Sequence, residues 1–161
     1  MGKIVLYDIL KEYENKLCDR TFVYELSNSQ IIKIQFYREQ LCHLLGVQHV
    51  YNNDKAYLGM KGFLKILNGK ISVKTLKAHN KREYSKIKER LNHFSEISDL
   101  LEKGTLIKFY IERVTPKTLI KADFCIFYEN QTYILHLFLI KESSSDYYAP
   151  TSFVVKSFND E

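Results

Sequence analysis

The sequence predicts an α+β fold: an N-terminal helix and β-hairpin, a helical middle, and a C-terminal antiparallel sheet of about four strands. Two patterns predict it. Apolar residues recur at steps of three and four through the helical parts of the chain, and after Gly104 they alternate with a period of two. We expect a single domain over residues 1–161, with a basic helical segment at 55–103 and the sheet at 105–158.

The first elements are a helix and a hairpin. Apolar positions within residues 3–18 share one face of a helix. Two β-rich runs, at 21–26 and 31–36, flank a Ser-Asn-Ser-Gln turn signal and predict a hairpin. A short helix over 38–45 is expected to end at Gly46, because glycine readily takes the left-handed conformation of a helix C-cap.

The helical middle is expected to begin after a loop over residues 47–57. One helix stops at the Asn-Gly pair of residues 68–69, and Ser72 is a candidate N-cap for the next. Asn80 is expected to cap the longest helix, over 81–103, whose apolar residues recur at helical spacing.

The C-terminal part alternates apolar and polar residues in four runs separated by turn signals. The second and third runs flank Glu-Asn-Gln and predict a second hairpin. The four expected strands cover residues 106–114, 119–128, 132–140 and 151–158.

Composition limits the class of protein. The chain of 161 residues and 19.1 kDa is long enough to bury a hydrophobic core. It contains no run approaching the roughly 20 apolar residues of a membrane span, and its N-terminus does not resemble a signal peptide. We therefore expect a stand-alone cytoplasmic protein that does not act at membranes. Its oligomeric state is left open.

The cysteines and histidines do not predict a metal site. Cys18, Cys42 and Cys125 are far apart and form no CxxC pair, so we expect buried, reduced thiols. The five histidines show no HxH or HExxH spacing. Within the chain, His136 is expected to be a half-buried strand residue. No cofactor is expected.

Positive charge is concentrated in residues 55–90. Eleven Lys and Arg stand there against two Glu, a net charge of +9 that leaves −4 for the rest of the chain. A one-sided basic segment of this kind is typical of a surface that binds a polyanion such as RNA. A solvated, lysine-rich helical face explains the pattern equally well. The candidate nucleic-acid-binding residues are Lys61, Lys65, Lys74, Lys77, Lys81 and Arg82.

Two groups of residues could carry chemistry. His43, at the end of a short helix before a glycine turn, could transfer a proton at neutral pH. By spacing alone, a histidine among leucines is more often a core residue. Hydroxyl groups gather at Tyr148, Thr151 and Ser152 and could bind a phosphate. Alternatively, they satisfy the backbone of a turn around Pro150.

These two groups also carry a resemblance to a known family. The run Phe-Tyr-Arg-Glu-Gln-Leu-Cys-His-Leu-Leu-Gly over residues 36–46 is similar to the FxxxxLxHLLG block of a set of phage-associated nucleases. The run Tyr-Ala-Pro-Thr-Ser-Phe over 148–153 resembles their later Y-x-P-x-[ST]-F block. These proteins form the fourth phage-type group of the barnase–EndoU–colicin–RelE superfamily, and the resemblance covers roughly residues 20–158.

The resemblance implies a barnase/RelE-like fold and metal-independent cleavage of RNA by a phage protein or toxin. It implies that His43 is the acid or base and that Tyr148, Thr151 and Ser152 bind or polarise the phosphate. The chemistry also needs a cation on the phosphate. Our candidates are Lys121, before the second predicted hairpin, and Lys141, at its end.

A second hypothesis is a nuclease-like phage protein that does not catalyse. It would use the same fold to bind nucleic acid or a host defence protein, as an anti-defence or anti-CRISPR-type inhibitor. RNA, and a host or cognate inhibitor protein, are the partners that these hypotheses imply. The sequence leaves open whether the chain is an active RNA endonuclease.

Overall fold

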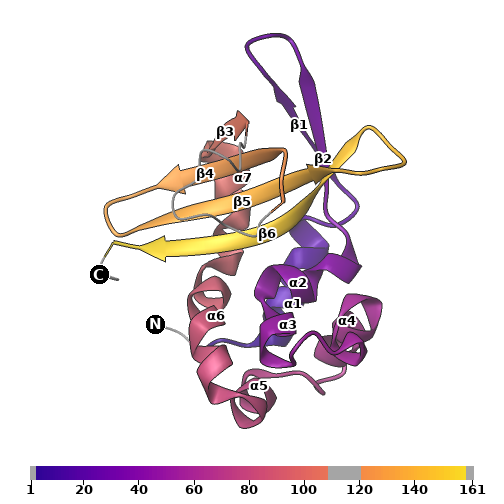
Figure 1. Ribbon diagram of the computed structural model, residues 1–161, viewed down its shortest axis with the longest axis vertical. Helices are drawn as coiled ribbons and strands as arrows, with labels where there is room; N and C mark the ends of the chain where they lie inside the picture. Colours follow the sequence, from indigo (N-terminus) through magenta and orange to yellow (C-terminus); the bar gives the residue numbers. More distant parts are fainter. Residues whose placement is uncertain (1–2, 109–120, 159–161) are drawn as a thin grey trace. The chain divides into compact units, whose positions relative to one another are not determined.

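The computed structural model describes residues 3–108 and 121–158, and its contacts divide the chain into two compact units (Figure 1). The helical unit comprises Met1–Cys18 and Tyr37–Glu96. The sheet unit comprises Asp19–Phe36 and Ile97–Glu161. That the whole chain acts as a single domain stays a prediction.

The sheet unit contains a six-stranded sheet in the order β1-β2-β6-β5-β4-β3 (Figure 1). Every neighbouring pair is antiparallel except β2 and β6, which run parallel. Its elements are β1 (Thr21–Glu25), β2 (Ile31–Gln35), α7 (Ile97–Lys103), β3 (Thr105–Lys108), β4 (Phe124–Glu129), β5 (Tyr133–Lys141) and β6 (Tyr147–Ser157).

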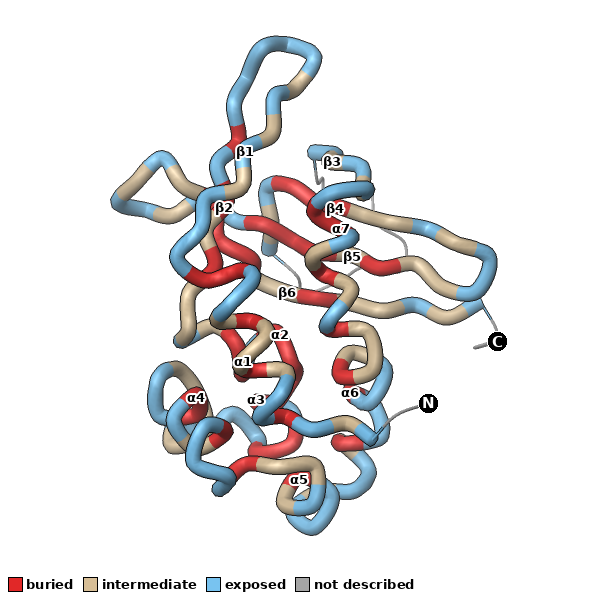
Figure 2. The backbone as a smooth tube through the Cα atoms, turned by 180° about the vertical axis from the view of Figure 1, so that it is seen from behind, coloured by how far each residue is buried: buried red, intermediate tan, exposed pale blue. Residues whose placement is uncertain are grey.

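Alternation of apolar and polar residues places one face of this sheet in a core. Ile32 and Ile34 of β2 are fully buried, whereas Ile31 before them and Lys33 between them are exposed. On β5, Leu137 is fully buried and pairs with equally buried residues on both sides, Ile126 of β4 and Phe153 of β6. The β1–β2 hairpin is largely exposed at its far end (Figure 2).

The expectation of an antiparallel sheet of about four strands was wrong in two respects. The predicted hairpin forms β1 and β2, but it joins the C-terminal strands in one sheet of six. It joins through a parallel pairing of Lys33 with Tyr147 and Ile34 with Tyr148. More than 100 residues separate these partners in sequence, and the local period of a strand carries no information about such a neighbour. The α+β class itself is confirmed.

The predicted strand boundaries agree in part with the structure. β5 and β6 match the last two predicted strands, except that β6 begins earlier, at Tyr147. The expected strands over 106–114 and 119–128 are represented by β3 and β4. Residues 109–114 and 119–120 of those predictions lie outside the described residues.

The helical unit packs short helices around residues such as Leu10, Tyr13, Leu44 and Leu76, which are at most 1% exposed. Ser72 forms a capping box with Thr75 at the start of α5, as the sequence predicts for an N-cap. The elements of the helical unit are α1 (Leu6–Lys16), η1 (Arg38–Gln40), α2 (Leu41–Leu45), α3 (Val47–Val50), η2 (Lys55–Tyr57), α4 (Gly59–Leu67), α5 (Val73–His79), α6 (Lys81–His93) and η3 (Phe94–Glu96).

Two helical predictions need correction. The expected loop over residues 47–57 contains α3 and η2. The expected helix over 81–103 is interrupted by the 3₁₀ turn η3. Its apolar spacing continues through the interruption, because a 3₁₀ turn changes the residues per turn only slightly. At this point the His93 ring contacts the carboxylates of Glu89 and Glu96.

No helix in the described ranges, 3–108 and 121–158, is long and apolar enough to cross a membrane.

Candidate functional site

His43 is the one exposed residue of α2. Its four helical neighbours, Leu41, Cys42, Leu44 and Leu45, are completely buried. In Figure 2, most of the α2–α3 backbone is coloured as buried. The interpretation of His43 as a core residue, which spacing alone favoured, was therefore wrong: the imidazole is accessible.

A left-handed turn at Gly46 sets the direction of the chain after His43. Gly46 has φ of 86° and ends α2 by donating its N–H to the carbonyl of His43 at 3.1 Å. The carbonyl of Gly46 then accepts the N–H of His49 at 3.0 Å, within α3. Two histidines, both exposed, therefore flank one tight turn.

The helix α6 packs directly against this turn. A methyl group built on Gly46 would lie 2.7 Å from Ile87 Cγ2 and 3.4 Å from Arg90 Nη1. Ile87 and Arg90 are three residues apart and so share one face of α6. The absence of a side chain at Gly46 thus lets the Arg90 guanidinium approach the backbone between the two histidines.

Charges interact within this cluster. Partial burial lowers the pKa of His49, and the positive charges of Arg90 and His43 lower it further, while Glu83 opposes them. Burial also lowers the pKa of Arg90. Within the described part of the chain, Arg90 forms no ion pair with a carboxylate.

Sequence reasoning did not select His49 or Arg90. His49 fell in an expected loop, and Arg90 was one of eleven basic residues in its segment. A usable signal was present: two histidines placed three residues before and three after one glycine. The approach of Arg90 depends on how α6 packs, which no local pattern reports.

The sheet unit brings Lys141 and Tyr148 together as partners across β5 and β6. Tyr148 is 9% exposed, and its ring meets the ring of Phe124 edge-on at 5.4 Å. Burial raises the pKa of Tyr148, and the negative charge of Asp123 raises it further. Asp123 in turn accepts the N–H of Lys141 at 2.8 Å. These residues come from three strand ends at one edge of the unit.

A hollow of about 350 Å³ opens beside this pair. Two lysines, Lys33 and Lys141, and one carboxylate, Asp146, border it, so its lining carries charges of both signs. The lining residues are Gln30, Ile31, Lys33, Lys141, Asp146 and Tyr148.

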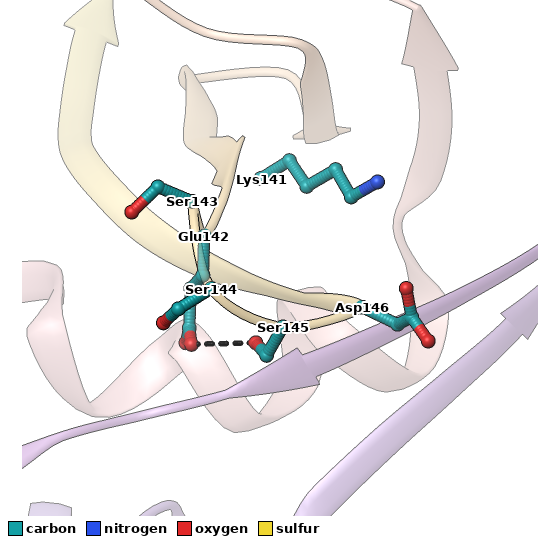
Figure 3. Close-up of a pocket in the computed structure, with 6 residues that line it drawn as sticks. All are labelled: Lys141, Glu142, Ser143, Ser144, Ser145 and Asp146. Carbon is teal, nitrogen blue, oxygen red and sulfur yellow. Dashed lines mark hydrogen bonds between the residues drawn. The ribbon is translucent and has the colours of Figure 1, made fainter.

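The loop between β5 and β6 borders a second, more open hollow of about 630 Å³ (Figure 3). Ser145 donates its hydroxyl to Glu142 Oε2 at 2.8 Å and accepts the N–H of Tyr147 at 3.2 Å. The Ser145 hydroxyl therefore holds the loop together, whereas Ser143 and Ser144 are exposed.

Thr151 and Ser152 lie away from Tyr148 on the strand. A bulge shifts the β5–β6 register, so that Phe138 pairs with Ser152 and Leu139 with Pro150, leaving Thr151 unpaired. Because Phe138 points to the opposite face of β5 from Lys141, Ser152 and Tyr148 lie on opposite faces of the sheet. The candidate cation Lys121 is exposed and lies just before β4.

The predicted nucleic-acid-binding residues belong to the helical unit. Five of them are exposed, namely Lys61, Lys74, Lys77, Lys81 and Arg82. Lys65 differs, because its ammonium donates to the carbonyl of Ala56 and lies 4.4 Å from the centre of the Tyr57 ring. Between residues 55 and 82 the sequence contains no acidic residue.

Among the described residues, no three His, Cys, Asp or Glu side chains group as ligands for a metal ion. The cysteines Cys18, Cys42 and Cys125 are free thiols and buried. Burial raises the pKa of Cys42 and of Cys125 to about 12, so neither is a nucleophile near neutral pH.

The α+β fold and the exposed histidine are compatible with a nuclease-like protein. A family model agrees, because it matches residues 5–161, essentially the whole chain. The chain belongs to the family described as phage-Barnase-EndoU-ColicinE5/D-RelE like nuclease4. Comparisons with curated proteins and with solved structures gave no match.

Proposed function

We propose that this chain is a metal-independent ribonuclease of the phage or toxin type, with His43 transferring a proton during cleavage. The observation that carries the proposal is the exposure of His43 on a helix whose other residues are all buried. In a chain of a nuclease-like family, an accessible imidazole is the group best suited to acid–base chemistry near neutral pH.

The reaction is a transesterification within RNA. The 2′-hydroxyl loses its proton to a base, its oxygen bonds to the adjacent phosphorus, and the bond from phosphorus to the 5′-oxygen breaks as an acid protonates that oxygen. The products are a 2′,3′-cyclic phosphate and a 5′-hydroxyl. Cations and hydroxyl groups stabilise the phosphate as negative charge builds. Lys141, Lys121, Tyr148, Thr151 and Ser152 are our candidates for this role.

The test is incubation of wild type, His43→Ala and His79→Ala with total RNA and with tRNA in the presence of EDTA. His79 is the matched control, because it is another exposed histidine of the helical unit. We expect wild type and His79→Ala to leave 2′,3′-cyclic phosphate ends, and His43→Ala to be slower by roughly 10²–10⁴-fold. Intact RNA in every sample, or equal cleavage by His43→Ala, would contradict the proposal.

A second candidate function is binding without catalysis. The acid-free stretch over residues 55–82 favours it, because exposed lysines there provide an electrostatic surface for nucleic acid regardless of any acid–base group. A phage protein of this type could act on host RNA or on a host defence protein in the cytoplasm. It would leave RNA intact in the test above and would bind it in a separate binding measurement.

A further inference from the structure

We infer that His43, His49 and Arg90 form one phosphodiester-binding cluster around the Gly46 turn, in which Arg90 holds the phosphate and His49 is the second proton-transfer group. This inference deepens the proposed function and rests on it for its catalytic part. All three side chains belong to the helical unit, on α2, α3 and α6.

Backbone geometry brings the three residues to one place. The successive hydrogen bonds Gly46 N–H to His43 and His49 N–H to the Gly46 carbonyl hold the two histidines on either side of the turn. Arg90 Nη1 lies 3.4 Å from the position that a Gly46 Cβ would occupy. Because Gly46 lacks a side chain, the guanidinium lies against the turn itself.

The half-buried positive charge of Arg90 points to an anionic ligand. Its guanidinium is half-buried, and burial destabilises an ion that has no counter-charge. The nearby acid Glu83 pairs with Lys86 at 2.9 Å instead, and no carboxylate in the described ranges pairs with Arg90. A guanidinium offers two parallel N–H donors, which match the oxygens of a phosphate.

The environment of His49 suits a general base. Burial together with the charges of Arg90, His43 and Lys86 favours the neutral form of His49, against the opposing effect of Glu83. Neutral His49 can therefore take the proton from the 2′-hydroxyl, and protonated His43 can give one to the leaving 5′-oxygen. One proton is taken and one is given, so the step balances, and both histidines return to their starting states by exchanging protons with water.

The test combines binding with cleavage. Uridine 3′-monophosphate is titrated into wild type, Arg90→Met and Arg90→Lys, and the ring signals of His43 and His49 are followed by NMR. We expect both rings to shift in wild type. Affinity should fall roughly 10-fold or more in Arg90→Met, with partial recovery in Arg90→Lys. Lys88→Met is the control, an exposed cation on the same helix. Unchanged affinity in Arg90→Met overturns the role of Arg90.

Cleavage assays with His49→Ala and His49→Asn separate this inference from the proposed function. If both cleave RNA like wild type while His43→Ala does not, the role of His49 is wrong and the ribonuclease proposal stands. If wild type leaves RNA intact but binds the nucleotide in an Arg90-dependent way, the binding site stands and catalysis fails. Loss of cleavage in both His49 variants, with folded NMR spectra, supports the inference in full.

Discussion

His136 shows how burial within the sheet changes a titratable residue. As the sequence predicts, it is a half-buried residue of β5. Its ring stacks on the Phe138 ring, with 5.9 Å between the ring centres. Burial lowers its pKa from 6.5, the positive charge of Lys156 lowers it further, and a hydrogen bond with the backbone of Val154 opposes both. The folded protein therefore binds a proton at this site less readily than the unfolded chain.

This difference makes stability depend on pH. As pH falls below about 6.5, the unfolded chain takes up the proton first, so we expect the free energy of unfolding to fall. The loss is at most about 1.4 kcal/mol per pH unit from this group. Urea denaturation at pH 7.5 and 5.5 should show a smaller pH effect in His136→Gln than in wild type. In Phe138→Leu, which removes the stacked ring but keeps the histidine, the pH effect should lie between those of wild type and His136→Gln, because the Phe138 ring contributes to the burial of His136. An unchanged pH effect in His136→Gln would refute the expectation.

Among the elements, the α2–α3 turn depends on a single glycine. Gly46 serves two purposes there: it takes a positive φ of 86°, and it leaves room for Ile87 of α6. Gly69 has a similar φ of 82°, but nothing lies within 4 Å of the position of its missing Cβ. Comparing alanine substitutions at Gly46 and Gly69 therefore separates the effect of backbone strain on stability from the effect of packing.

We predict that Gly46→Ala is more destabilising than Gly69→Ala. The left-handed conformation costs roughly 1–2 kcal/mol in either variant. Gly46→Ala adds roughly 1–3 kcal/mol, because its methyl group overlaps Ile87 in a packed interior. Chemical denaturation of the two variants measures the difference. Equal losses of stability would mean that α6 does not pack closely against the turn.

At the scale of the whole molecule, charge is unevenly distributed along the chain. Residues 55–90 carry +9 and the remainder carries −4. The exposed lysines of this segment lie on several short helices, so they present charge along a surface and not at one point. When such a surface binds RNA, counterions are released from the RNA phosphates, which makes the affinity dependent on salt.

We expect the triple variant Lys61→Ala, Lys74→Ala and Lys81→Ala to bind single-stranded RNA more weakly. The dependence of log affinity on log salt should become shallower by about 2, if each lysine contacts one phosphate. Fluorescence anisotropy at several salt concentrations provides the measurement.

The control removes the same number of charges elsewhere, at exposed Lys16, Lys103 and Lys156. If both triple variants lose the same affinity and the same salt dependence, net charge alone governs binding. The basic segment would then be a solvated face without a specific role in binding RNA.

The sequence by itself determined the α+β class, the hairpin and the helix end at Gly46, because each depends on residues close together in the chain. Alternation over a few residues predicts a strand, and glycine after an apolar helix predicts a left-handed cap. The family blocks also selected His43, Tyr148, Thr151 and Ser152 from local runs of residues, and their roles stay predictions. The expected loop over 47–57 was wrong, because α3 is only four residues long and short helices have weak local signals.

Only the tertiary structure decided which distant residues meet. The parallel pairing of β2 with β6 and the approach of Arg90 to Gly46 join segments at least 40 residues apart. It also decided that His43 is accessible and that Ser152 and Tyr148 face opposite sides of their sheet. These outcomes depend on packing and strand register over the whole fold, and a single bulge or a missing side chain changes them. Local periodicity cannot report either effect.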